Sequence, residues 1–84
     1  MNYNFHGRGV VYDLRNWTYF EGFFQEGKRI GQSIDYYANG DYEYSIYNLK
    51  EKKDGKALYF KSNQTSEPIV KVYNNGRKIK EYWW

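Results

Sequence analysis

The sequence predicts an all-β protein, a single antiparallel sheet that meanders through about three β-hairpin repeats. Aromatic residues make up 23% of the chain and include eleven tyrosines, and strands favour such residues. Glycines recur at regular spacing between the aromatic residues, and no stretch between them keeps the apolar i, i+3, i+4 pattern of a helix. The length of 84 residues suits one domain.

A repeat of 24 residues organises the chain, and two columns of residues mark it. In the first column, three decapeptides begin with glycine, at positions 7, 31 and 55. Their fourth residue is aliphatic (Val10, Ile34 and Leu58), and their sixth is aromatic (Tyr12, Tyr36 and Phe60). The second column pairs an apolar with an aromatic residue at 23–24, 46–47 and 72–73. We expect one domain, 1–84, with repeats at about 1–16 (partial), 17–40, 41–64 and 65–84 (partial).

Each repeat has the pattern of a hairpin. In the best-preserved copy, one strand is expected at about 19–25 and a second at about 32–38, with a basic, glycine-containing turn between them. The following "ANGD" contains Asn-Gly, a strong turn signal because both residues tolerate positive φ. The segment 62–68 holds the only proline and is expected to be a longer connection.

The segment 20–41 follows the pattern aromatic-x-Gly-x-aromatic, then Gly-Lys-x-x-Gly, then a strand ending in Tyr-x-Asn-Gly. The matching residues are Phe20, Gly22, Phe24, Gly27, Lys28, Gly31, Tyr37, Asn39 and Gly40. This segment resembles a MORN repeat, including the variant of bacterial antitoxin-like proteins. The later copies depart from the pattern, with Ser45 and Lys50, then Lys71 and Lys80, where glycines are expected. The resemblance implies a scaffold that binds proteins and sometimes acidic lipids.

Strand alternation separates two faces if Gly22 pairs with Ser33. The nearly all-apolar face is the expected core: Val10, Tyr12, Phe23, Ile34, Tyr36, Ile46, Leu58, Phe60, Val72 and Trp83, with Glu21 as an unexplained exception. The other face mixes aromatic and small polar residues. We expect it to bind a partner through Phe20, Phe24, Tyr37, Tyr47, Tyr59, Tyr73 and Trp84. Alternatively, its aromatic residues only stabilise the sheet, since cross-strand pairs contribute about 0.2–1 kcal/mol each.

Basic residues gather in the expected turns at one end of the repeats. The segments 25–31, 48–56 and 74–80 carry nine Lys or Arg and three Asp or Glu, a net +6, whereas the rest of the chain sums to −3. The expected basic rim, which would steer an acidic partner, consists of Lys28, Arg29, Lys50, Lys52, Lys53, Arg77 and Lys78. A simpler explanation is that turns are polar and that lysines protect sheet edges from aggregation.

Catalysis is not expected. The single histidine, His6, has no nucleophile pattern beside it, and the acidic residues do not cluster as metal ligands would. Gly7-Arg8-Gly9 lacks the context of a phosphate-binding loop. We therefore expect no enzyme, no catalytic residues, no metal and no cofactor. Without cysteines, a secretion signal or a long apolar run, the chain is expected to be cytoplasmic, with no transmembrane segment.

Three classes of function fit these observations. The favoured one is a stoichiometric protein inhibitor, such as an antitoxin, an immunity protein or a phage anti-CRISPR, whose partner is a toxin or defence effector. The second is a binder of anionic surfaces, either phospholipid headgroups or nucleic acid, through the basic rim. The third is a structural module that self-associates through open sheet edges. The terminal strand "EYWW" makes a homodimer plausible.

Overall fold

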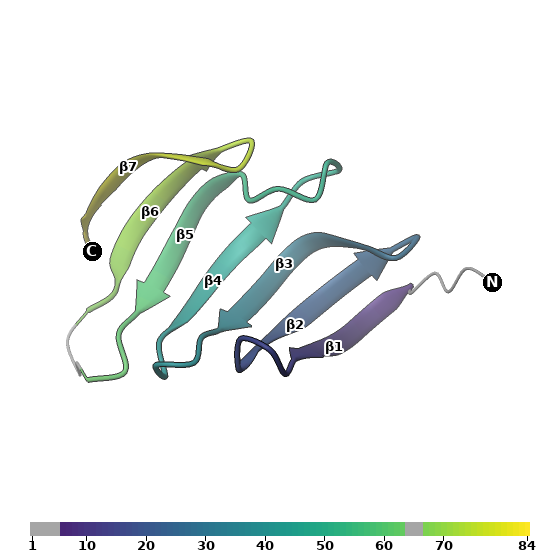
Figure 1. Ribbon diagram of the computed structural model, residues 1–84. Coiled ribbons are helices and arrows are strands. Elements are labelled where there is room, and N and C mark those ends of the chain that lie inside the picture. The colour runs from purple at the N-terminus through teal and green to yellow at the C-terminus, as the bar shows by residue number, and fades with distance from the viewer. Residues whose placement is uncertain (1–5, 64–66) are drawn as a thin grey trace.

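The computed structural model describes residues 6–63 and 67–84, and every regular element in these ranges is a β-strand. One antiparallel sheet contains all of them in chain order, so the predicted all-β meander is confirmed (Figure 1). Short connections join most neighbouring strands, as in hairpins. The strands are β1 (Gly7–Asp13), β2 (Thr18–Gln25), β3 (Lys28–Tyr36), β4 (Tyr42–Tyr47), β5 (Gly55–Phe60), β6 (Ile69–Asn74) and β7 (Arg77–Trp83).

The turns are tighter than the sequence suggested. Glu26 and Gly27, with φ of 51° and 79°, form a two-residue turn, so β3 begins at Lys28 and not near residue 32. Asn75 and Gly76 do the same between β6 and β7, with φ of 51° and 93°. Two consecutive residues at positive φ match the right-handed twist of the flanking strands. Lys28 and Arg77 therefore begin strands.

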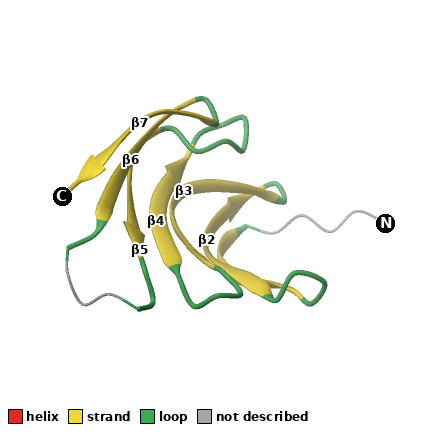
Figure 2. Cartoon of the chain, turned by 60° about the vertical axis from the view of Figure 1, so that its left-hand side comes forward, coloured by secondary structure: helices red, strands yellow, loops and turns green. Residues whose placement is uncertain are grey.

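The sheet curls, and one of its faces becomes the inside of the curl (Figure 2). We call this the inner face. Gly9, Gly22, Ser33 and Ser45 are successive partners across β1 to β4, and the predicted pairing of Gly22 with Ser33 is confirmed. A Cβ on Gly22 would lie only 2.8 Å from the Ser33 Cβ. This row of small residues lets the strands bend inward and lets large neighbours fold over the backbone.

The expected core face is the opposite, outer face, so that prediction is wrong. Tyr12 is 69% exposed, and Val10, Phe23 and Ile46 are also exposed. The buried side chains Phe20, Phe24 and Ala57 belong to the inner face. With a single layer, the concave side of the curl shields more of its side chains from water. On the outer face only Val70, 3% exposed between Leu58 and Tyr82, is fully buried among the described residues. Five other members of the expected core are partly buried: Ile34, Tyr36, Leu58, Phe60 and Val72.

Two smaller expectations about the faces also change. Trp83 pairs with Ile69, which places it on the inner face near its end, where it is 62% exposed. Glu21 is no longer an exception, because it lies on the outer face and forms an ion pair with Arg8 at 3.0 Å. The outer face accepts this charge since water reaches it.

Candidate functional site

The centre of the inner face holds a buried carboxylate, Glu43, which is only 1% exposed. Its Oε1 accepts hydrogen bonds from the Lys53 ammonium at 2.6 Å and from the Tyr37 hydroxyl at 2.9 Å. Its Oε2 accepts one from the Tyr73 hydroxyl at 2.8 Å. These donors come from the residue just after β3, the β4–β5 loop and β6, so one side chain of β4 joins four segments of the chain.

A second carboxylate extends this cluster. Asp35 accepts a hydrogen bond from the Tyr47 hydroxyl at 2.9 Å and lies 3.6 Å from the Lys53 ammonium. Burial acts to lower the pKa of Lys53, but hydrogen bonding and attraction from Glu43, then attraction from Asp35, raise it above its ordinary value. Lys53 therefore stays charged at neutral pH and neutralises part of the buried negative charge.

The phenols around these carboxylates stay protonated. Burial, followed by the neighbouring carboxylates, raises the pKa of Tyr37, Tyr47 and Tyr73 well above the ordinary value. Burial and the hydrogen bond to Asp41 raise the pKa of Tyr59 to about 12. A phenol held neutral in this way donates hydrogen bonds and does not act as a base or nucleophile near neutral pH.

An open hollow of about 560 Å³ lies over this cluster. Tyr37, Tyr59 and Tyr73 line it together with Lys53 and Lys71. The Lys71 ammonium lies 3.7 Å from the centroid of the Tyr59 ring, a close cation–π contact. Most polar groups here already hydrogen-bond one another, so the hollow offers shape and ring faces more than free hydrogen-bonding groups.

The structure brings together four of the seven expected partner-binding residues. Tyr37, Tyr47, Tyr59 and Tyr73 are partly buried on the inner face, around Glu43 and Asp35. Phe20 and Phe24 belong to the same face but are buried, which leaves them little surface for a partner. Trp84 stands apart, 66% exposed just after β7. The role of this set in binding remains a prediction.

The three expected basic turns lie together at one end of the sheet. The Arg29 backbone N–H donates to Glu51 at 3.2 Å, and the Asn48 side-chain amide donates to Asn75 at 2.9 Å. The backbone N–H of Gly76 donates to the Lys53 carbonyl at 2.7 Å. These bonds connect the β2–β3 turn, the β4–β5 loop and the β6–β7 turn into one rim.

Only part of the expected basic rim presents free charge. Lys53 points to the buried carboxylates, Arg29 lies over the Phe20 ring at 4.8 Å, and Lys78 pairs with Glu81 at 2.7 Å. In residues 6–63 and 67–84, the rim residues with no ion pair are Lys28, Lys50, Lys52 and Arg77, all exposed.

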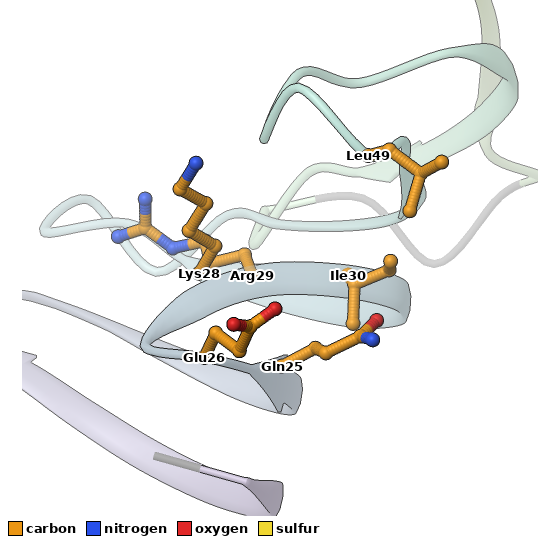
Figure 3. A pocket seen from close by; sticks show the side chains of 6 residues that line it. All are labelled: Gln25, Glu26, Lys28, Arg29, Ile30 and Leu49. Carbon is orange, nitrogen blue, oxygen red and sulfur yellow. The ribbon is translucent and has the colours of Figure 1, made fainter. Parts of the chain in front are cut away.

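A hollow of about 330 Å³ opens in this rim. Figure 3 shows Leu49, from the β4–β5 loop, above Ile30 of β3, with Lys28 and Arg29 earlier on the same strand. Leu49 is 79% exposed, so the rim combines cations with an accessible apolar side chain.

The outer face carries an aromatic ladder of five rings, three of which were expected in the core. Successive rings from β1 to β5 lie 5.3, 4.2, 5.8 and 4.8 Å apart between centroids: Tyr12, Tyr19, Tyr36, Tyr42 and Phe60. In the sequence, the ladder was visible as the aromatic positions of the first repeat column, Tyr12, Tyr36 and Phe60. No second layer covers this ladder in the described part of the chain.

Two other kinds of site have no candidates among residues 6–63 and 67–84. No group of three or more His, Asp or Glu residues is placed to hold a metal ion within 6–63 and 67–84. In the same ranges, no helix is long and apolar enough to cross a bilayer. No family model matches the chain, and no match was found among curated proteins or among solved structures.

Proposed function

We propose that this chain is a small non-enzymatic protein-binding module that acts as a stoichiometric inhibitor. The inhibitor types in view are an antitoxin, an immunity protein and a phage anti-defence protein such as an anti-CRISPR. The observation that carries the proposal is the uncovered aromatic ladder of the outer face, with Tyr12 69% and Tyr42 37% exposed. Contiguous exposed apolar surface on a small protein is typical of an interaction site.

The outer face supports this role better than the expected inner face does. The inner tyrosine hydroxyls are used to hold Glu43 and Asp35, whereas the ladder rings are held by stacking and keep their outer surface free. Tyrosine and phenylalanine contribute large contact area with little side-chain entropy to lose. A partner would therefore gain affinity from the ladder, and the basic rim would steer its approach.

Rigidity also favours an inhibitor. The Glu43 cluster and the bonds between the rim turns fix the curvature of the sheet before any partner arrives. A surface that is already in its bound shape avoids the ordering cost of association. This supports a protein that blocks a target by binding, without chemistry of its own.

The test is affinity capture from lysate of the source cells, followed by titration of any defined partner. The double variant Tyr12→Ser/Tyr42→Ser should weaken binding by about 1–3 kcal/mol per important contact. The control is Trp17→Ser, which removes an aromatic residue of the β1–β2 turn that is more exposed than Tyr12 and Tyr42 and lies outside the ladder. Unchanged affinity of the double variant would contradict the use of the outer face. Recovery of bulk nucleic acid, with no defined protein, would contradict the inhibitor proposal.

A second candidate function rests on the rim. The unpaired cations Lys28, Lys50, Lys52 and Arg77 lie on the same rim as the exposed Leu49, an arrangement that suits an anionic surface of phospholipid or nucleic acid. Under this alternative, binding to anionic vesicles or DNA should fall steeply with salt, and Lys50→Gln/Lys52→Gln should weaken it. The ladder variant should then have little effect.

A further inference from the structure

A β-bulge breaks the regular pairing of β2 with β3 on the outer face. Gly22 pairs with Ser33, but the next residue, Phe23, pairs with Ile30. Gly31 and Gln32 therefore have no partner on β2, although they pair with β4. Such a bulge bends the strand locally and redirects its side chains. Here the bulge lies beside a hollow in the outer face that Phe23, Ile34 and Tyr44 line.

A hollow of about 260 Å³ lies at this bulge. Phe23 lines it together with Ile34 and Tyr44, and the Arg8–Glu21 ion pair borders it. Its volume is smaller than the roughly 300–1,000 Å³ of drug-sized ligand sites. It suits a single side chain of a partner protein, and it lies within the exposed apolar surface of the outer face.

The charges on the outer face are mostly positive. Strand register places five cations on this face, Arg8, Lys28, Lys56, Arg77 and Lys80, and its carboxylate Glu21 is engaged by Arg8. Lys56 and Lys80 both pair with Val72, and neither has an ion pair in the described ranges. Unpaired ammonium groups therefore lie on the outer face. Their complement on a partner is a carboxylate.

We infer that the hollow at the β2–β3 bulge is the anchor site of the outer face, where an acidic protein segment inserts one aromatic or aliphatic side chain. This inference rests on the proposed protein-binding function and names the chemistry of the partner. The hollow favours a protein over a nucleic acid, because its walls include Phe23 and Ile34 and its one cation, Arg8, is already paired with Glu21 and not free for a phosphate. Anchors of this kind dominate interface energetics when surrounding contacts exclude water.

The test uses NMR titration of the isotopically labelled protein with synthetic peptides of about seven residues. The probe peptide has tryptophan at its centre and glutamates on both sides. One comparison peptide replaces the tryptophan by alanine, another replaces the glutamates by lysine, and a short single-stranded DNA is the fourth probe. We expect the glutamate–tryptophan peptide to shift the amide signals of Gly22, Phe23, Gln32 and Tyr44 and to bind about tenfold more tightly than either comparison peptide.

Variants separate the two parts of the inference. Phe23→Ser should weaken the probe peptide about tenfold, and Lys56→Gln/Lys80→Gln should weaken it and reduce its salt dependence. The matched control, Lys50→Gln, removes an equally exposed lysine from the rim and should change neither. Circular dichroism checks that each variant folds. The peptide comparison on the unaltered protein needs no variant.

Several outcomes would overturn the inference. These are no binding at millimolar peptide, equal binding of the lysine-flanked peptide, shifts confined to the inner face or rim, or stronger shifts of the same amides by DNA. The proposed function is tested separately. If a captured partner is lost by the Tyr12→Ser/Tyr42→Ser variant but unaffected by Phe23→Ser and Lys56→Gln/Lys80→Gln, the anchor inference fails while protein binding stands.

Discussion

Replacing Glu43 by alanine should destabilise the protein more than any comparable change at an exposed ion pair. The substitution removes the acceptor for Lys53, Tyr37 and Tyr73. The Lys53 side chain is only 16% exposed and keeps the weaker contact with Asp35 at 3.6 Å and a hydrogen bond to the Tyr37 hydroxyl at 3.2 Å. Removing one partner of a buried ion pair costs about 3–5 kcal/mol. The remaining Asp35 contact and partial exposure of Lys53 place the expected loss near the lower value, about 3 kcal/mol.

A loss of this size is large for a domain of 84 residues. Total stability scales as roughly 0.05–0.15 kcal/mol per residue, so this protein is expected to have about 4–13 kcal/mol. A loss of about 3 kcal/mol corresponds to a decrease in Tm of about 12–24 °C. Urea unfolding followed by far-ultraviolet circular dichroism would measure the free energy, and a thermal scan would measure Tm.

Two further variants complete this experiment. Glu51→Ala removes an exposed pair with Arg29, where the two side chains are 37% and 38% exposed, together with the acceptor of the Arg29 backbone N–H, and should cost about 1–2 kcal/mol. Glu43→Leu/Lys53→Met removes both charges and should cost less than the sum of its single changes. If Glu43→Ala lowers the free energy of unfolding by no more than Glu51→Ala, the reasoning about the buried cluster is refuted.

Three other predictions concern packing, pH and assembly. Gly22→Ala should lower the free energy of unfolding in urea by about 1–3 kcal/mol, because the new Cβ would lie 2.8 Å from the Ser33 Cβ and 3.0 Å from a backbone oxygen. Gly9→Ala would meet only an aromatic ring, at 3.4 Å, and should cost less. Equal losses for the two variants would contradict this prediction. The urea midpoint of unfolding should fall as the pH rises from about 10 toward 12. In this range tyrosines of the unfolded chain release protons that the folded protein retains on phenols such as Tyr59, because their pKa values are raised. A constant midpoint would argue against the raised pKa values. Trp83 and Trp84 are exposed at the open edge of the sheet formed by β7. If this edge forms a homodimer, deleting both residues should change the molecular mass measured by light scattering. An unchanged mass and an unchanged melting temperature would exclude both residues from the core and from an interface.

Local patterns were sufficient for much of the fold. Alternation of residue types and the 24-residue period predicted strands, their antiparallel order and the pairing of Gly22 with Ser33. The Glu26-Gly27 turn was missed because glutamate is uncommon at positive φ, so the expected turn was too long. The Glu43 cluster had no local signal either, since its donors are 6, 10 and 30 residues away along the chain.

The sequence alone determined which residues share a face for every member of the expected core except Trp83, because side chains alternate along a strand. It did not determine which face is inside. In a single layer that choice depends on the direction of curl, which the row Gly9, Gly22, Ser33 and Ser45 sets only after the strands align in register. Curling toward these small residues buries Phe20 and Glu43 and leaves Tyr12 in water. Only the tertiary structure therefore decided that the apolar repeat column lies on the outer, partly exposed face and that most of the buried side chains belong to the mixed face.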